Sequence, residues 1–292
     1  MFYLVFLFGL IAGSFLNVVI YRLKNGRNMI FGRSFCPECK INLRWYDLVP
    51  VLSFFWLKRR CRYCKKKISW QYPIVEILSG LIWILVFNKN LDNFQFSIFN
   101  FQYLNLEIFN YLNFVYHIFI LSALLVIAAY DFKWKIIPDK IVYPSIIVAF
   151  LYNVLNSLKY FNFETFKYLN FETFKLLNLE IFKYINFEIF IYPLFTAIAA
   201  FLFFFLIYFF SKGRAMGLGD AKLAFLIGLF LGPVSAAAAL MSAFIIGAVF
   251  GIILLALGVK NLKSQIAFGP FLVLGAAIAF FFSDFTFKLL NF

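Results

Sequence analysis

The stretch MGLGDAKLAFLIGLFLG, residues 216–232, decides how this sequence folds, because an acid and a lysine open an otherwise apolar run. Asp220 follows the glycine pair Gly217 and Gly219 and stands two residues before Lys222. The chain around this run has 292 residues, of which 64% are hydrophobic. That is far more apolar material than one soluble core buries, so the sequence predicts a membrane protein. Asp220 then lies where a membrane helix begins.

Further apolar runs are long enough to cross about 30 Å of hydrocarbon, which takes roughly 20 residues each. The first lacks a basic segment before it and a small-residue cleavage site after it, so we interpret it as a membrane span and not a cleaved signal. We therefore expect an all-α polytopic membrane protein with about eight transmembrane helices, at residues 2–21, 68–87, 111–130, 140–158, 191–210, 216–232, 234–257 and 268–282.

The net charge of +14 is explained by topology. Many of the basic residues lie between Arg22 and Lys67, directly after the first span, and such segments stay in the cytoplasm. Alternation then returns the chain to the cytoplasm at 131–139, 211–220 and 258–267, each with lysine or arginine. If the short sixth run only dips into the membrane, everything after it inverts. Without a base-reading motif, the charge does not indicate a nucleic-acid partner.

Four cysteines form the pairs CPEC, residues 36–39, and CRYC, residues 61–64. Cys36, Cys39, Cys61 and Cys64 are spaced to present a thiolate tetrahedron to one structural Zn²⁺ ion, with no position left open for catalysis. Disulfides are the alternative, but they rarely persist in the reducing cytoplasm. We expect a small cytoplasmic zinc module between the first two spans.

Two aspartates, Asp131 and Asp220, stand at the cytoplasmic mouths of predicted spans. Taken singly, each could be a helix N-cap. Taken together, two carboxylates in a low-dielectric site share a proton, so one can activate water while the other protonates the leaving group. Glu76, early in the second span, is a further candidate or an interfacial ion-pair partner. His117, the single histidine, lies near the outer end of the third span without an acid or thiol neighbour, so we do not expect it to be catalytic.

Near-repeats of eight residues, beginning with NFETFKYL, fill the predicted outer loop at 159–190. Eight residues turn a helix about 80° beyond two full turns, so no steady apolar stripe results. We interpret the segment as a repeat insertion in a tolerant loop, lying on the lipid interface, and leave a dedicated partner site as the alternative. The expected divisions are a first span (1–21), a zinc-binding loop (22–72) and a membrane domain that carries both aspartates (73–292).

Several motifs, in this order, resemble the bacterial type IV prepilin peptidase family: GSFLNVVIYRL, the two cysteine pairs, WYDLVPVLSF, YPIVEILSG, YDFKWKIIPD, GLGDAKL and FGPFLVLGA. The resemblance implies that Asp131 and Asp220 are the catalytic pair of a G-x-G-D membrane aspartic protease. It implies cleavage of the short basic leader of type IV prepilins or secretion pseudopilins, at the cytoplasmic face of the inner membrane. The cysteine loop resembles that of members that also methylate the new N-terminus from S-adenosylmethionine. The octad repeats depart from the family pattern.

Two rival functions remain open at this stage. A non-enzymatic assembly factor, docking a cytoplasmic partner through its zinc module, would tolerate Asp220→Asn and lose its role with Cys36→Ser. A proton or cation carrier would need acids lining a path through the membrane, whereas Asp131 and Asp220 are predicted on one side. The methyl-donor site is not identified by any sequence motif.

Overall fold

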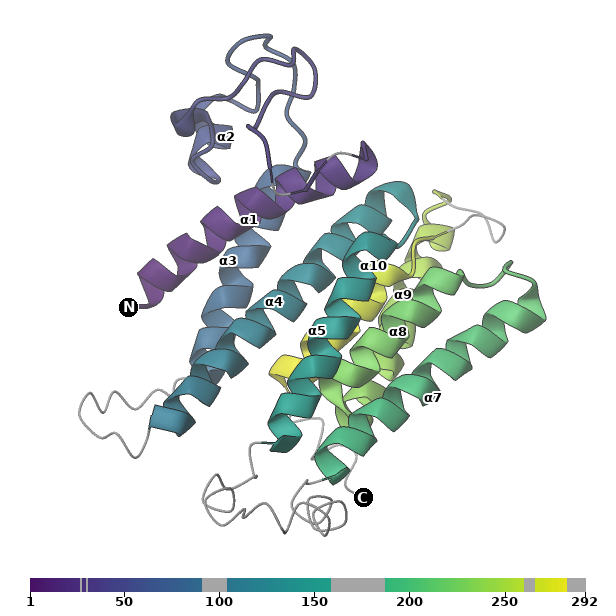
Figure 1. The fold of residues 1–292 in the computed structure, drawn as a ribbon. Coiled ribbons are helices and arrows are strands. Elements are labelled where there is room, and N and C mark those ends of the chain that lie inside the picture. Colours follow the sequence, from purple (N-terminus) through teal and green to yellow (C-terminus); the bar gives the residue numbers. More distant parts are fainter. Residues whose placement is uncertain (27, 30, 91–103, 159–186, 260–265, 283–292) are drawn as a thin grey trace. The chain divides into compact units, whose positions relative to one another are not determined.

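A computed structural model describes the chain except for residues 27, 30, 91–103, 159–186, 260–265 and 283–292. The predicted repeat insertion therefore lies almost wholly outside the described residues. The described residues are helical, with only isolated β-bridges. The helices are α1 (Phe2–Lys24), η1 (Trp45–Asp47), α2 (Leu52–Trp56), α3 (Gln71–Asn90), α4 (Leu104–Trp134), α5 (Asp139–Leu158), α7 (Phe187–Ser211), α8 (Leu218–Leu231), α9 (Pro233–Ala256) and α10 (Gly269–Phe281) (Figure 1).

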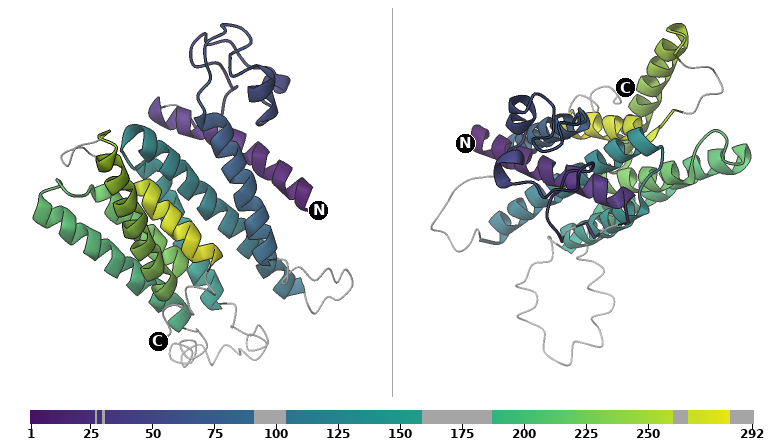
Figure 2. Two further views of the ribbon diagram at one scale, coloured as in Figure 1. Left: turned by 180° about the vertical axis from the view of Figure 1, so that it is seen from behind. Right: turned by 90° about the horizontal axis from the view of Figure 1, so that it is seen from above.

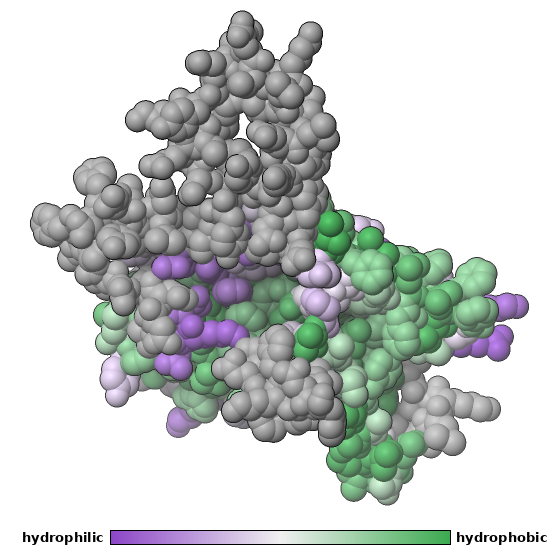
Figure 3. Space-filling view, turned by 90° about the horizontal axis from the view of Figure 1, so that it is seen from below, coloured by the Kyte–Doolittle hydropathy of each residue, from purple (hydrophilic) through white to green (hydrophobic). Residues whose placement is uncertain are grey.

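The prediction of an all-helical membrane protein is confirmed. Among the described residues, six helices are long and apolar enough to cross a bilayer: α1, α3, α4, α5, α7 and α9. Helices also occupy the sixth and eighth predicted spans, but α8 has 14 residues and α10 has 13. At about 1.5 Å per residue these reach only about 20 Å, so eight crossings stay a prediction. Hydrophobic residues cover much of the described helix surface seen in Figure 3.

The chain divides into two compact units, Met1–Lys140 and Ile141–Phe292. In the first unit, α1 packs along α3, and α4 packs against both. The contact between α1 and α3 is close because both helices present small residues. A Cβ atom added at Gly9 would lie 2.7 Å from the Cα of Gly80, and one at Gly13 would lie 2.6 Å from the Cα of Glu76. Such small-residue interfaces let membrane helices approach at backbone distance.

The segment that leaves α1 is fixed by a buried arginine. Arg22 is 4% exposed, and its guanidinium donates hydrogen bonds to five backbone carbonyls of the following turn, those of Asn28, Met29, Phe31, Gly32 and Arg33. These carbonyls satisfy a charge that would otherwise be costly to bury. Arg22 thereby turns the chain from the membrane helix into the cysteine-bearing segment, which lies beyond the ends of α1 and α3 (Figure 2).

The second unit is a helix bundle in which α8 contacts α7, α9 and α10. Gly228 of α8 again permits close packing, since an added Cβ would lie 2.5 Å from the Cα of Ala197 in α7. The buried Asn153 side chain of α5 donates a hydrogen bond to the Leu229 carbonyl of α8 at 2.9 Å. One residue, Gly232 with φ of 72°, joins α8 to α9. This left-handed conformation favours glycine and reverses the chain sharply.

The glycine contact between α1 and α3 gives a testable prediction. Gly13→Ile should lower the thermal unfolding midpoint in detergent by several degrees, because the new side chain meets the α3 backbone and overpacking costs about 1–3 kcal/mol. The measurement is tryptophan fluorescence during heating.

The matched control is Gly251→Ile in α9, where an added Cβ meets nothing within 4 Å among the described residues. Equal midpoints for the two variants would contradict the close α1–α3 contact.

Candidate functional site

The cysteine pairs lie in two turns of the same backbone design. In the first turn, the N–H of Cys36 donates to the carbonyl of Ile41, and the N–H of Lys40 donates to the carbonyl of Cys36. In the second, Cys61 and Lys65 repeat this pattern, and Cys61 donates to Lys66. Lys40 and Lys65 both have a φ near 60°. The bridges Phe35 to Asn42 and Arg60 to Lys67 close the turns at equivalent positions. We call residues 34–69, which hold both turns, the cysteine module.

The module brings the four thiols together as predicted. The Sγ atoms of Cys36, Cys39, Cys61 and Cys64 all lie within 4.8 Å of one another, and those of Cys36 and Cys64 are 3.9 Å apart. A tetrahedral ion with metal–sulfur bonds of about 2.3 Å requires sulfur–sulfur edges of about 3.8 Å. The arrangement therefore fits one metal ion.

The backbone also prepares these thiols to bind a cation. Burial by itself raises the pKa of the Cys61 thiol, but N–H groups of Cys64 and Tyr63 and the thiols of Cys36 and Cys64 outweigh it. The result is a pKa of about 7 for Cys61. Thiolates are the metal-binding form of cysteine, so the turn that holds Cys61 favours that form near neutral pH.

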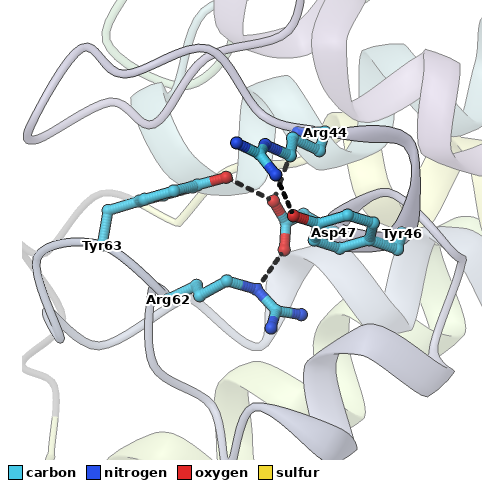
Figure 4. Close-up of polar contacts among 5 residues, drawn as sticks. All are labelled: Arg44, Tyr46, Asp47, Arg62 and Tyr63. Carbon is cyan, nitrogen blue, oxygen red and sulfur yellow. Dashed lines mark hydrogen bonds and ion pairs between the residues drawn. The ribbon is translucent and has the colours of Figure 1, made fainter.

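Asp47 ties the second cysteine turn to the segment between the two turns (Figure 4). Its side chain is only 2% exposed and accepts hydrogen bonds from the Arg62 guanidinium at 2.7 Å, the Tyr63 hydroxyl at 3.1 Å and the Arg44 backbone N–H at 3.2 Å. Burial raises the pKa of Asp47, but these donors more than offset burial and hold the pKa below its ordinary value. Asp47 therefore stays ionised and anchors the second cysteine turn to η1.

Asp220 is buried, 9% exposed, in the first turn of α8. Its Oδ2 accepts the backbone N–H of Gly217 at 3.1 Å, where the helix begins. The N-terminal end of a helix favours a negative charge. The N-cap of α8 is Gly217, so Asp220 is not the N-cap itself; its carboxylate supports the start of the helix from within the first turn.

Asp131 is buried, 4% exposed, and lies in the last turn of α4, which continues to Trp134. It is therefore not a helix N-cap. The C-terminal end of a helix disfavours a negative charge, so local helix stability does not explain an acid at this position. Asp131 belongs to the first unit and Asp220 to the second. Their convergence stays a prediction.

Glu76 lies in the first turns of α3 and is buried, 6% exposed. Its Oε2 accepts the backbone N–H of Val51 at 2.7 Å, so it holds the segment before α2. Among the described residues, no lysine or arginine lies within ion-pair distance of it. His117 lies 14 residues before Asp131 on α4, about 21 Å along the helix axis. It is thus remote from that acid.

Asn17, which was not predicted from the sequence to be functional, is 2% exposed in α1. Its Nδ2 donates to the carbonyls of Gly13 at 3.3 Å and Tyr72 at 3.0 Å. Within the described part of the chain, its Oδ1 has no hydrogen-bond partner. An asparagine inside the apolar run of GSFLNVVIYRL was the available signal, because polar residues within membrane spans are usually functional or paired.

Fold and site thus define a multi-pass membrane protein with a four-cysteine cluster that can hold a metal ion, and comparison with known proteins identifies its family. Residues 7–90 match the Bacterial Peptidase A24 N-terminal domain, and residues 118–255 match the Type IV leader peptidase family. The chain belongs to this peptidase family. The first match contains all four cysteines and Glu76, and the second contains Asp131 and Asp220.

Curated relatives extend the similarity over nearly the whole chain. The chain is 26% identical to a prepilin leader peptidase/N-methyltransferase of Aeromonas salmonicida, covering 97% of this chain and 91% of the relative. It is 27% identical to a protein of the same name in Bacillus subtilis, covering 96% and 94%. A Vibrio cholerae relative is 38% identical over 49% of this chain and 53% of its own length. No solved structure matches at a significant level.

The thiol cluster predicts one tightly bound metal ion per chain. Purified protein should contain about one equivalent by elemental analysis, and Cys39→Ser should reduce it to a small fraction, because three thiolates form an incomplete site. Ser53→Ala, which removes a hydroxyl from α2 of the module and leaves all four cysteines in place, is the control and should retain the metal. A metal-free wild type that folds normally would contradict the prediction.

Proposed function

We propose that the chain is a membrane aspartic endopeptidase that removes the short basic leader of type IV prepilins or pseudopilins, and that it methylates the new N-terminus from S-adenosylmethionine. The carrying observation is that Asp131 and Asp220, both buried, lie within the residues matching the Type IV leader peptidase family. The names of the curated relatives support both activities for this chain.

The topology of the helices supports placing both acids on one side of the bilayer. In the first unit, Lys24 at the end of α1 lies 5.8 Å from the Trp134 ring at the end of α4, so Asp131 is at the end from which the cysteine module leaves α1. The linker from Trp134 to Asp139 comprises five residue steps, at most about 18 Å. It is too short to recross about 30 Å of hydrocarbon.

Contacts within the second unit extend this argument to Asp220. The Lys222 ammonium of α8 lies 5.0 Å from the centre of the Tyr143 ring of α5. The first turns of α5 and α8 are therefore neighbours. Because α5 begins on the side where α4 ends, α8 begins on that side as well. The basic segment after α1 favours the cytoplasm for this side, and with it the inner membrane as the location.

The proposed chemistry uses the two carboxyl groups in different protonation states. The ionised one takes a proton from water as the water oxygen bonds to the scissile carbonyl carbon, and the protonated one gives its proton to the departing amine. In the methylation, the lone pair of the freed amine bonds to the methyl carbon, the carbon–sulfur bond breaks with its electrons remaining on sulfur, and the amine releases a proton. The membrane-buried substrate helix would hold the scissile bond in place.

The cysteine module has a structural role in this proposal. We propose Zn²⁺ as its ion, with Cys36, Cys39, Cys61 and Cys64 as ligands, because a tetrahedral thiolate set is typical of structural zinc. Four thiolates leave no open position, so the metal would hold the module's shape and take no part in either reaction. The expected division of the chain into span 1–21, module loop 22–72 and peptidase domain 73–292 belongs to this proposal.

The decisive test is leader cleavage by detergent-purified protein acting on a model prepilin. Asp131→Asn and Asp220→Asn should each reduce the rate by about 100-fold or more, because a positioned acid or base contributes about 10²–10⁴-fold. Asp139 is an exposed acid at the start of α5, so the control variant Asp139→Asn should cleave normally.

Methylation of a precleaved pilin separates the two activities. Both catalytic variants should still methylate it, as detected by mass spectrometry, because the new N-terminus is already free. Normal cleavage by either variant would refute the acid pair. If Asp220→Asn supports pilus assembly in cells while Cys36→Ser does not, the docking-factor alternative is correct.

A further inference from the structure

A cavity of about 340 Å³ lies within the first unit, between the cysteine module and the adjoining ends of α1 and α3. Its wall includes Asn17 and Tyr21 of α1, Tyr72 and Glu76 of α3, and Phe54 of the module. Ligand sites in proteins commonly have volumes of about 300–1,000 Å³. The cavity therefore has the size of a small-molecule site, and both membrane helices and the module contribute to it.

One wall carries a buried acid, Glu76, that forms no ion pair with any described residue. The two other acids that line the cavity belong to the module and are ion-paired, Asp47 with Arg62 at 2.7 Å and Glu38 with Lys66 at 2.5 Å. For Glu76 the described residues supply only hydrogen bonds. A buried carboxylate without a cation is costly. A ligand with a positive charge would offset that cost.

Asn17 provides a second, independent observation that points to a ligand in the cavity. Its amide nitrogen is fully engaged by the carbonyls of Gly13 and Tyr72, which fixes the orientation of the side chain. Its Oδ1 is left as a buried acceptor without a partner among the described residues, and Asn17 lines the cavity. Buried polar atoms are nearly always hydrogen-bonded. An N–H or O–H group in the cavity would satisfy it.

The remaining wall combines aromatic rings with cations. Tyr21, Phe35, Phe54 and Tyr72 offer flat apolar surface, and Arg33, Lys67 and Lys133 bring positive charge. A ligand that suits all of these walls has a flat ring system, a cationic group, hydrogen-bond donors and a carboxylate. S-adenosylmethionine has each of these: an adenine, a sulfonium and an ammonium, ribose hydroxyls and an amino-acid carboxylate.

The segment over the cavity is held in a strained conformation by the same acid. Val51 has a φ of 60°, which β-branched residues rarely adopt, and its N–H donates to Glu76. Strained backbone of this kind is found preferentially at ligand and active sites. Glu76 thus links the shape of the module to the floor of the cavity.

We propose that this cavity is the methyl-donor site, in which Glu76 and the Oδ1 of Asn17 bind the cationic end of S-adenosylmethionine. This inference rests on the proposed methylation and assigns it a place in the first unit. The aromatic rings hold the adenine, and the basic residues bind the donor's carboxylate. Glu76 is thereby a binding residue for the donor and is separate from the peptidase pair.

The test measures equilibrium binding of tritiated S-adenosylmethionine to the full-length, metal-loaded protein in detergent. Glu76→Gln removes the charge and keeps an oxygen that accepts the N–H of Val51, so the module retains its anchor. Loss of a charge-assisted contact should weaken donor binding by about 10- to 100-fold. Metal content and leader cleavage of this variant should equal those of the wild type, and Asp139→Asn should bind the donor normally.

Direct ultraviolet crosslinking of the tritiated donor gives a readout that does not depend on any variant. The label should map to peptides within residues 17–76. Unchanged donor binding by Glu76→Gln, or label confined to residues 141–292, overturns the assignment while leaving methylation intact. A wild type that cleaves prepilin but binds no donor refutes methylation and this site together. A raised KM for leader cleavage with unchanged donor binding would show that the basic leader occupies the cavity.

Discussion

The cost of placing a charge in hydrocarbon is the constraint on which this structure depends. A carboxylate within a bilayer is tolerated only where protein groups, water or another charge surround it. Asp131, Asp220 and Glu76 obey this rule, because each lies within the first or last turns of an apolar helix and each is buried by protein. Three buried acids at helix ends, in a chain of mean hydropathy +0.89, are therefore the residues on which the proposed sites rest.

Close packing of α1 and α3 forms one side of the proposed donor site. Gly9 and Gly13 let the helices approach, and the same contact brings Asn17 within 3.0 Å of the Tyr72 carbonyl. Arg22 then directs the chain into the cysteine module, and Asp47 fastens the second cysteine turn. In this arrangement a metal ion bound by the four cysteines would stabilise the module over the ends of α1 and α3. The proposed donor site is the space that the module encloses.

Sequence patterns identified the helices and the cysteine cluster because both signals are local. Apolar runs predict spans by length, and two C-x-x-C pairs predict one ion by spacing. Boundaries were less accurate: Asp131 was placed after its span, whereas α4 continues through it to Trp134. This boundary matters for the role of Asp131, because a residue in the last turn of a helix cannot be the N-cap of that helix. The runs at α8 and α10 were predicted as full crossings, and their lengths leave that count open.

The contacts of Asn17, Glu76 and Val51 could not be read from the sequence, because they depend on how α1, α3 and the module pack. The proposed acid pair depends on packing of the same kind. The most direct test is an experimental structure of the protein with an uncleavable prepilin. Our account predicts that carboxylate oxygens of Asp131 and Asp220 flank the scissile bond, near enough to share a proton, about 3 Å apart or bridged by one water. Carboxylates that face opposite leaflets, or that lie away from the leader junction, would contradict it.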